Sequence, residues 1–491
     1  MSRSRPRLLV SLLMVMGVVA AACGGPKGSS DNGAAGKVTK DKLPDCPVAT
    51  LAKTKGPIHI TLWYGGLAGK TQSTMKDIAD SFNQSQSQVV VDAQNQGQSY
   101  DEVLQKYRGA VSTKQLPSIA YLENTSLRVM VDSGTAVPAE ACMKADKFDT
   151  SVIAPTIRSY YSINGVQWPG YANVSEPVLY YNKALFTKAG LDPDKPPKNL
   201  DDLRVAAVKL KAAGVKAPLA LSLKRWFVES WLTGAGIDVV NQGNGRDGLP
   251  DKANLANPTT LKILEWMKKM QADGLMQPIP NTPGNIDQYT SLLDNSAMTI
   301  ETSAASTTIK AFLKGDITGK DIGAGDIKVD PTKLAAADGP YPGVKEPGKV
   351  SVGGGAFFLV DPKANTKSPV TLAASWTFLK FMLQKQQVLK WHLQGSYLPI
   401  VKGVDDDPQV TSFWKDQVDG KMLKVAWTQL QSVDPKHPGP LIGSYTDYGK
   451  AVEGMLDAVM FKGTDPTKAM NTAQTELDRV LKQYKDDNKG G

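Results

Sequence analysis

Apolar segments that alternate with helix-like segments are the feature that most constrains the fold of this chain. An apolar stretch at 58–63 runs into a glycine-bearing turn, and apolar residues then recur at helical spacing over 75–82. The order repeats with a strand expected at 89–91, a helix from 100 to about 111 and a strand after Pro117. This alternation predicts an α/β fold with a parallel sheet, whose ligand groups lie at the carboxyl ends of the strands.

The first 23 residues indicate export from the cytoplasm. A basic cap of three arginines precedes an apolar run at 8–22, which is shorter than the ~20 residues of a membrane-spanning helix and is typical of a secretory signal peptide. Cys23 follows in a pattern that resembles the bacterial lipobox, although Ala20 replaces the usual Leu. By that resemblance, residues 1–22 are removed and Cys23 is acylated. A plain cleaved signal with an unmodified Cys is the alternative.

The next segment is expected to tether a soluble body to the membrane. From Gly24 to Lys42 the composition is rich in Gly, Ser, Asp, Asn and Lys, with little to bury, so residues 23–45 are expected to form a lipidated N-terminus and a flexible tether. Two or more acyl chains suffice for lasting attachment. No later segment contains an unbroken apolar run of twenty residues. We therefore expect an extracytoplasmic protein, anchored to the outer face of the cell membrane by Cys23 alone.

Two cysteines remain in the body, Cys46 and Cys142. In an oxidising compartment such a pair commonly forms a disulfide, which we expect here, with two separate buried thiols as the alternative. The histidines, His59, His392 and His437, are far apart in the sequence and none has a partner at ligand spacing. The sequence therefore predicts no metal site, and no cofactor.

Length and charge favour a two-domain protein that does not bind nucleic acid. Removing 22 signal residues from 491 leaves 469, which is long for one domain. The formal net charge of +9 includes three signal arginines and no signal acids, so +6 remains, without a block of five like charges. Nucleic-acid binding needs a clustered basic stripe with aromatic residues on it.

Two glycine-rich segments approach nucleotide-binding motifs without matching them. Residues 63–71 carry Tyr64 where a P-loop needs its first Gly. Residues 243–248 have the dinucleotide spacing, but Pro250 and Pro258 follow where a helix should begin. The sequence also lacks a Gly-x-Ser-x-Gly elbow and a His-Glu-x-x-His helix.

A family resemblance begins at residues 168–190. This segment reads Trp-Pro-Gly-Tyr-Ala-Asn-Val-Ser-Glu-Pro-Val-Leu-Tyr-Tyr-Asn-Lys-Ala-Leu-Phe-Thr-Lys-Ala-Gly, and Pro196-Pro197 and a helix at 199–203 follow it. It resembles the extracellular solute-binding proteins of ABC importers, in the maltose-binding branch. Further matches follow in the same order at 297–301, 350–355, 376–381, 395–399 and in the helix pair after Tyr445. The resemblance covers about 58–484.

The resemblance implies an α/β, two-lobe periplasmic-binding-protein-like fold with a hinged interlobe cleft. We expect lobe 1 to contain 46–170 plus 356–399, and lobe 2 to contain 171–352 plus 400–491. Crossings between the lobes are expected near 171–177, near 353–355 and near Pro399. The three glycines at 353–355 are suited to absorb the backbone change of closure, although a bulge or tight turn is the alternative.

Aromatic residues at the expected cleft point to a sugar, because sugars present flat C–H faces to aromatic rings. By resemblance, Trp226 and the pair Tyr445 and Tyr448 lie where sugar binders place stacking rings. Each aromatic candidate has a core position as its alternative. The aromatic candidates are Tyr64, Tyr121, Trp168, Tyr171, Trp226, Tyr445 and Tyr448. Three other tryptophans in helical apolar stripes, Trp266, Trp376 and Trp391, are expected in the core.

Polar and glycine candidates complete the expected ligand site. They are Gly66, Glu123, Asn124, Glu301, Thr302, Ser303 and Gly354. The alternatives are helix capping for Asn124 and a surface acid for Glu301. Glycerol-phosphate binders of the family tend to have a basic residue near the position matched by Ser444 and Tyr445. This sequence has none there, which weakens a phosphate ligand without excluding it.

The sequence therefore predicts a binding protein that captures a sugar or similar polar solute and delivers it to ABC permease subunits. A glycerophosphodiester or polyol is the alternative ligand. A secreted glycoside hydrolase would also combine cleft aromatics with two carboxylates, and Glu123 with Glu301 is the candidate pair. A hinged cleft would hold such a pair poorly at fixed separation, so we expect no enzyme.

An adhesive lipoprotein is the third class of function considered. We expect a monomer.

Overall fold

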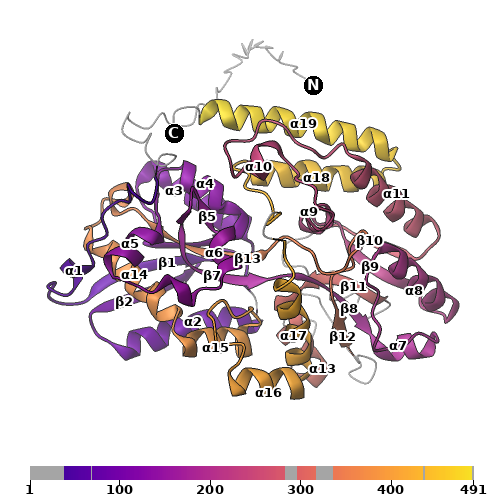
Figure 1. The fold of residues 1–491 in the computed structure, drawn as a ribbon, viewed down its shortest axis with the longest axis horizontal. Coiled ribbons are helices and arrows are strands. Elements are labelled where there is room, and N and C mark those ends of the chain that lie inside the picture. The colour runs from indigo at the N-terminus through magenta and orange to yellow at the C-terminus, as the bar shows by residue number, and fades with distance from the viewer. Residues whose placement is uncertain (1–37, 68, 282–295, 317–335, 435–436, 489–491) are drawn as a thin grey trace, which may run out of the picture.

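Two β-sheets form the framework of the protein. The computed structural model describes residues 38–67, 69–281, 296–316, 336–434 and 437–488. The expected signal peptide, Cys23 and most of the tether lie outside these described residues. Figure 1 shows the two sheets side by side, each with helices packed around it. This architecture matches the two-lobe α/β fold expected from the sequence.

The first sheet has the strand order β2-β1-β3-β13-β4, and β7 also pairs with β13. Its strands are β1 (Ile58–Tyr64), β2 (Val89–Asn95), β3 (Ile119–Glu123), β4 (Ala136–Val137), β7 (Pro169–Ser175) and β13 (Gly353–Val360). The short strands β5 (Ser162–Ile163) and β6 (Val166–Gln167) pair separately. β1 is parallel to β2 and β3, whereas β13 is antiparallel to β3, β4 and β7. The strands expected at 58–63, at 89–91 and after Pro117 are confirmed.

Helices from the N-terminal third of the chain and from residues 370–395 cover the first sheet. They are α1 (Val48–Leu51), α2 (Gly69–Ser85), α3 (Tyr100–Thr113), α4 (Leu127–Asp132), α5 (Ala139–Ala145), α6 (Pro155–Tyr160), α14 (Val370–Met382) and α15 (Lys385–Gly395). The apolar stripe expected at 75–82 is the buried face of α2, which contacts α14 and α15. α3 begins at Ser99, whose side chain accepts a hydrogen bond from the amide of Glu102.

The second sheet has the order β10-β9-β11-β8-β12. Its strands are β8 (Pro177–Asn182), β9 (Ala217–Ser222), β10 (Met276–Ile279), β11 (Ser296–Thr302) and β12 (Ala336–Gly339). The helices of this half are α7 (Lys183–Lys188), α8 (Leu200–Ala212), α9 (Arg225–Gly234), α10 (Asn241–Gly245), α11 (Pro258–Ala272), α13 (Ser306–Lys314), α16 (Pro408–Asp416), α17 (Val418–Leu430), α18 (Tyr445–Met460) and α19 (Pro466–Asp487). α18 packs along α19 and contacts α9 and α11.

The chain passes between the sheets at β7–β8 and again just before β13. Only Glu176 separates β7 from β8, and β13 starts at Gly353. We therefore propose that the first boundary lies at Glu176 and that lobe 1 resumes at Gly353. The third passage follows α15, where the amide of Leu398 donates to the carbonyl of Val174 over 2.8 Å.

The three glycines at 353–355 are strand residues with close neighbours. Gly354 has φ +112°, and a Cβ there would lie 2.0 Å from the carbonyl oxygen of Asn173. Gly353 and Gly355 leave similar room for aromatic rings. The alternative of a bulge or tight turn is not seen at these positions, because all three glycines pair in register with β7 and the register shift of β13 lies between Phe357 and Phe358. The hinge remains a prediction.

The hydrophobic core contains most of the large aromatic residues. Trp376 and Trp391 are each 1% exposed, which confirms that they are core residues. Trp266 is partly buried, packs against the core and donates from Nε1 to the carbonyl of Leu200 over 3.1 Å. No helix in the described ranges is long and apolar enough to cross a membrane.

Cys46 and Cys142 form a disulfide in the structure, with their Cα atoms 5.0 Å apart. The bond joins the segment just before α1 to α5, and the two residues are separated by 96 positions. A covalent link across so long a loop removes much conformational entropy from the unfolded chain.

Replacing both cysteines, Cys46→Ala with Cys142→Ala, should lower the free energy of unfolding by about 4 kcal/mol, because the unfolded chain regains the entropy of that loop. Urea denaturation under oxidising conditions measures the difference. A reductant should destabilise the wild-type protein and leave the double variant unchanged. Equal stability of the two proteins without reductant would contradict the expectation.

Candidate functional site

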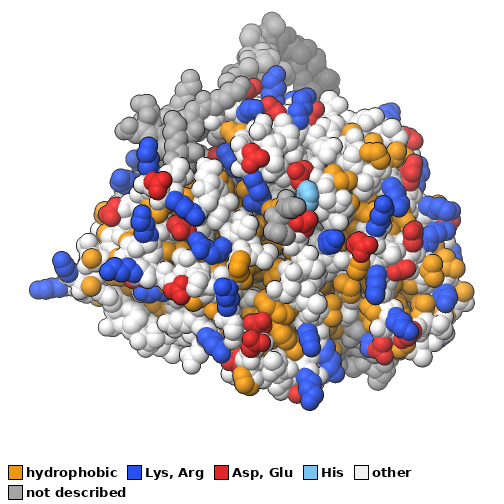
Figure 2. All heavy atoms as spheres, viewed as in Figure 1, with side chains coloured by type: hydrophobic (Ala, Val, Ile, Leu, Met, Phe, Trp, Pro, Cys, Tyr) orange, Lys and Arg blue, Asp and Glu red, His pale blue; other side chains and the backbone are white. Residues whose placement is uncertain are grey.

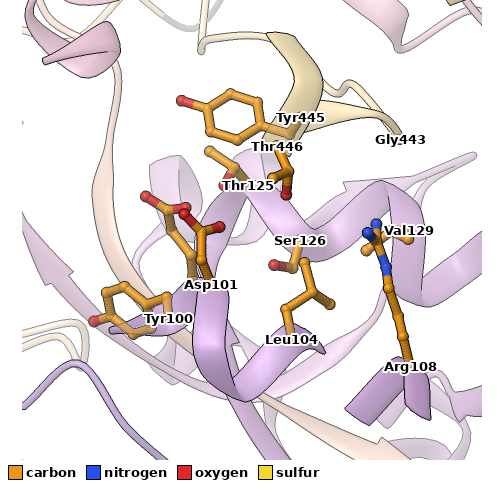
Figure 3. A pocket seen from close by; sticks show the side chains of 11 residues that line it. Tyr100, Asp101, Leu104, Arg108, Thr125, Ser126, Val129, Gly443, Tyr445 and Thr446 are labelled. Carbon is orange, nitrogen blue, oxygen red and sulfur yellow. The ribbon is translucent and has the colours of Figure 1, made fainter. Parts of the chain in front are cut away.

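A narrow crevice separates the first lobe from the start of α18. It is lined by Tyr100, Asp101, Leu104, Arg108, Glu123, Thr125, Ser126, Val129, Gly443, Tyr445 and Thr446. Figure 3 shows Tyr445 and Thr446 of α18 facing side chains from α3 and from Thr125 and Ser126, which follow β3. The crevice has room for about one water molecule, so the two sides are close together in this structure.

Arg225 is a largely buried cation that pairs with two of the acids that line the crevice. It is the first residue of α9, and its guanidinium lies 3.2 Å from Glu123, 3.4 Å from Glu453 and 3.8 Å from Asp101. Glu123 and Asp101 belong to the first lobe, whereas Arg225 and Glu453 belong to the second. These ion pairs therefore connect the two lobes directly across the crevice.

The same guanidinium lies over the ring of Tyr445, 5.1 Å from its centre. The sequence has no basic residue beside Tyr445, but the fold brings Arg225 there from a distant segment. A positive charge therefore lies beside Tyr445 although the adjacent sequence supplies none, and the absence of a basic residue in that segment no longer weakens a phosphate ligand. Arg225 is adjacent in sequence to Trp226, so the sequence alone could have placed it near the expected cleft. Its contact with Tyr445 could not be predicted from the sequence.

Tyr445 and Tyr448 form a stacked pair, with ring centres 5.4 Å apart and planes at 28°. The hydroxyl of Tyr445 donates to Glu229 over 2.9 Å. Burial raises the pKa of Glu229 to about 7, against the hydrogen bonds from Tyr445 and Ser351, which act to lower it. Tyr445 lines the crevice, whereas Tyr448 is fully buried behind it.

Trp226 is partly buried on α9 and packs against the first lobe at Gly353. Its Nε1 is buried and has no hydrogen-bond partner among the described residues. The ring thus stands at the junction of the lobes, where a stacking role is possible only if the crevice opens.

A cluster of tyrosine hydroxyls lies on the first-lobe side. The hydroxyl of Tyr121 is 3.0 Å from that of Tyr100 and 3.3 Å from that of Tyr397. Tyr121 is fully buried, whereas Tyr100 reaches the crevice. Gly66 has φ +69°, and a Cβ there would lie 3.2 Å from Tyr100. Tyr64 is buried at the end of β1 and is absent from the crevice lining.

Three of the polar candidates, at the end of β11 and just after it, have structural partners. Glu301 is 2% exposed and pairs with Lys224 at 2.7 Å, so the surface-acid alternative is wrong. Burial lowers the pKa of Lys224, which the carboxylate partly offsets. The Thr302 side chain caps the short helix Ser303–Ala305, and Ser303 accepts a hydrogen bond from the amide of Glu176.

Asn124 connects the end of β3 to the crossing segment. Its Nδ2 donates to the carbonyl of Val352 over 2.7 Å and to the hydroxyl of Tyr160 over 2.5 Å. Its side chain makes no helix cap, so the capping alternative is wrong. Gly354, in β13, lies against the backbone of Asn173.

Trp168 and Tyr171 lie in the core of the first lobe and do not line the crevice. Trp168 is 2% and Tyr171 3% exposed, and the Tyr171 ring packs on Phe357 with ring centres 5.6 Å apart. β7 is covered by α14, which explains their burial. Both residues therefore occupy core positions, as their alternative has it, and their contact with the solute stays a prediction.

Several site residues were missed by reading the sequence alone. They are Tyr100, Asp101, Lys224, Arg225, Glu229, Tyr397 and Glu453. Tyr100 and Asp101 begin the helix that follows β2, so the rule that sites lie at strand ends points to them. The others depend on tertiary contacts between segments far apart in the sequence.

The raised pKa of Glu229 predicts a pH effect on stability. Its usual value is 4.5 and its folded value about 7, so the folded protein holds a proton that the unfolded chain releases between these pH values. Stability should fall as the pH rises through this window. Glu229→Gln should therefore be more stable than the wild-type protein at pH 8, by about 3 kcal/mol, and the difference should vanish near pH 4.

Urea denaturation at both pH values measures this difference. Glu476→Gln, on the exposed surface of α19, is the matched control and should show no comparable gain at pH 8. A gain from Glu229→Gln of the same size at pH 4 and pH 8 would contradict the prediction.

Comparison with known proteins identifies relatives over almost the whole chain. A family model described as bacterial extracellular solute-binding protein matches residues 77–417. The sn-glycerol-3-phosphate-binding periplasmic protein UgpB of Escherichia coli is 26% identical over 446 residues, which cover 89% of this chain and 95% of that protein.

Solved structures share the fold. The cyclic alpha-maltosyl-1,6-maltose binding protein of Arthrobacter globiformis has a TM-score of 0.67 at 20% identity, and the match covers 87% of this chain and all of that one. UgpB of Mycobacterium tuberculosis, in complex with glycerophosphocholine, has a TM-score of 0.66 at 18% identity, over 88% of this chain and all of that one. With a family model that matches more than half of its length, this chain belongs to the bacterial extracellular solute-binding proteins.

Proposed function

We propose that this protein captures a neutral, hydroxyl-rich solute, a sugar, between its two lobes and delivers it to the permease of an ABC importer. The observation that carries the proposal is the charge beside the crevice, where the guanidinium of Arg225 faces the carboxylates of Asp101, Glu123 and Glu453. These three carboxylates outnumber the two guanidinium groups there, those of Arg225 and of Arg108 in the lining. A doubly charged phosphate monoester would meet net negative charge there, whereas a neutral solute would not.

The chemistry of the lining fits a sugar. Carboxylates accept hydrogen bonds from the hydroxyl groups of a sugar. The guanidinium of Arg225 donates hydrogen bonds to the oxygen atoms of such hydroxyl groups. The rings of Tyr445 and Trp226 supply flat apolar surface next to these polar groups. A site that combines an aromatic surface with convergent polar groups is typical of small-molecule pockets.

A glycerophosphodiester is the second candidate. It is favoured by the position of Arg225 over the ring of Tyr445 and by the similarity to proteins named for sn-glycerol 3-phosphate and solved with glycerophosphocholine. A diester carries one negative charge, so it would replace only one of the carboxylates that pair with Arg225. Arg108, exposed at the rim of the crevice, adds a second cation.

A glycoside hydrolase is disfavoured by the contacts of its candidate acids. Glu123 pairs with Arg225, and Glu301 pairs with Lys224. Both candidate acids are engaged by cations of the protein, and Glu301 is not among the residues that line the crevice, so the two do not form the facing pair that glycoside hydrolysis requires. The matching family consists of binding proteins.

The attachment and partners expected from the sequence belong to the same proposal. We propose a monomer, lipidated at Cys23, held at the outer face of the cell membrane and in contact with permease subunits. Figure 2 shows Lys and Arg side chains interspersed with Asp and Glu over the visible face, a distribution that supports the expectation that nucleic acid is not a partner.

Calorimetric titration with a defined panel tests the ligand class. Maltose, maltotriose, tagatose, glycerol 3-phosphate and glycerophosphocholine are compared at low and high salt. We expect a sugar to bind and its affinity to change little with salt, because its contacts are not ionic. Binding of glycerophosphocholine alone, weakened by salt, would support the second candidate and contradict the first.

Trp226→Ala should reduce affinity for the bound panel member by about thirtyfold, since the loss of a stacking ring is worth ~2 kcal/mol. Calorimetry measures the affinity and urea denaturation the stability. Trp266→Ala is the matched control, because this partly buried ring packs on Trp231, donates to the carbonyl of Leu200 and does not line the crevice, so its loss should change stability without changing affinity. Normal affinity in folded Trp226→Ala would contradict the placement of Trp226 in the site.

A further inference from the structure

Asn173 is a buried polar residue next to the crevice that the described contacts leave incomplete. It lies on β7 and is 1% exposed. Its Nδ2 is 3.4 Å from the hydroxyl of Tyr121, while its Oδ1 has no hydrogen-bond partner among the described residues. Buried acceptors are nearly always paired, so such an atom in a native fold calls for an explanation.

The glycines of β13 bring Asn173 close to both lobes. Gly355 is its direct partner on β13, and Gly353 lies two positions earlier. A Cβ at Gly353 would lie 2.3 Å from the ring of Trp226, and a Cβ at Gly355 would lie 2.3 Å from the ring of Tyr121. Trp226 from the second lobe and Tyr121 from the first therefore rest on neighbouring positions of one strand, beside Asn173.

Trp226 presents the complementary group. Its Nε1 is a buried donor that has no partner in the described part of the chain, whereas Asn173 Oδ1 is a buried acceptor in the same condition. The donor belongs to one lobe and the acceptor to the other. Separation of the lobes would uncover both.

A hydroxyl cluster connects this position to the crevice. Asn173 contacts Tyr121, and Tyr121 contacts Tyr100, which lines the crevice. A solute that enters between the lobes thus meets a continuous polar path that ends at Asn173.

We propose that Asn173 Oδ1 and Trp226 Nε1 form a subsite for hydroxyl groups of the solute, which makes Asn173 a specificity-determining residue. A hydroxyl group both donates and accepts, so one hydroxyl, or two neighbouring ones on a sugar ring, satisfies the acceptor on one lobe and the donor on the other. The inference rests on the proposed function, because it needs a hydroxyl-bearing solute between the lobes.

Asn173→Leu tests the subsite, because Leu has nearly the same shape and no polar atoms. Maltose, maltotriose, tagatose and glycerophosphocholine are titrated into the full-length protein, and the variant should bind the one that binds the wild-type protein about tenfold more weakly. The melting temperature of the protein without solute should not fall, since the substitution removes an unpartnered buried acceptor. A lower melting temperature with unchanged affinity would assign Asn173 to the fold and overturn the inference.

Thr260→Val is the matched control. Thr260 lies on α11, is fully buried, and its Oγ1 likewise has no partner among the described residues, but it is not part of the crevice lining. Its replacement should leave affinity unchanged, and an equal loss in both variants would overturn the inference. If the wild-type protein binds none of the four probes, the proposed function fails and the inference with it. Wild-type binding with unchanged affinity in Asn173→Leu would refute the inference alone.

Discussion

The antiparallel pairing of β13 with β3 and β7 is the constraint on which the two-lobe arrangement depends. Residues 353–360 join the first sheet only after the chain has built the second, and Gly355 pairs with Glu123 on one side and with Asn173 on the other. Phe357 anchors the strand by packing on the rings of Tyr121 and Tyr171. The first lobe is therefore incomplete until the chain has crossed twice, and the crossings lie directly beside the residues of the crevice.

Charge is distributed so that the empty crevice holds its own counter-ions. Arg225 is largely buried, and removing a guanidinium from water is costly unless carboxylates surround it. Because two of its three carboxylates come from the other lobe, the ion pairs favour approach of the lobes. A solute that enters must take over these contacts, so the same groups that hold the crevice closed also select what replaces them.

The sequence was sufficient to predict many of the helices and strands. It was insufficient to predict which side chains meet at the crevice. The strands near 58 and 89, the stripe on α2 and the paired cysteines follow from periodicity and from composition, which are local properties. Whether an aromatic residue lies in the core or at the crevice depends on tertiary packing, and for this reason the sequence did not show that Trp168 and Tyr171 are buried away from the crevice lining. The contact between Arg225 and Tyr445 joins positions 220 apart, and no local pattern encodes it.

The unpartnered polar atoms and the ion pairs have opposite effects on the arrangement of the lobes in this structure. The ion pairs of Arg225 stabilise it, whereas the buried Oδ1 of Asn173 and Nε1 of Trp226 destabilise it, because each has lost water without gaining a partner among the described residues. In the proposed subsite, a hydroxyl-bearing solute supplies partners to the two unpartnered atoms and so removes their destabilising effect. It weakens the ion pairs of Arg225 only where it displaces a carboxylate. Closure is then more favourable with solute than without it, and this difference in free energy is what a binding protein needs to shift its population toward the closed form on capture.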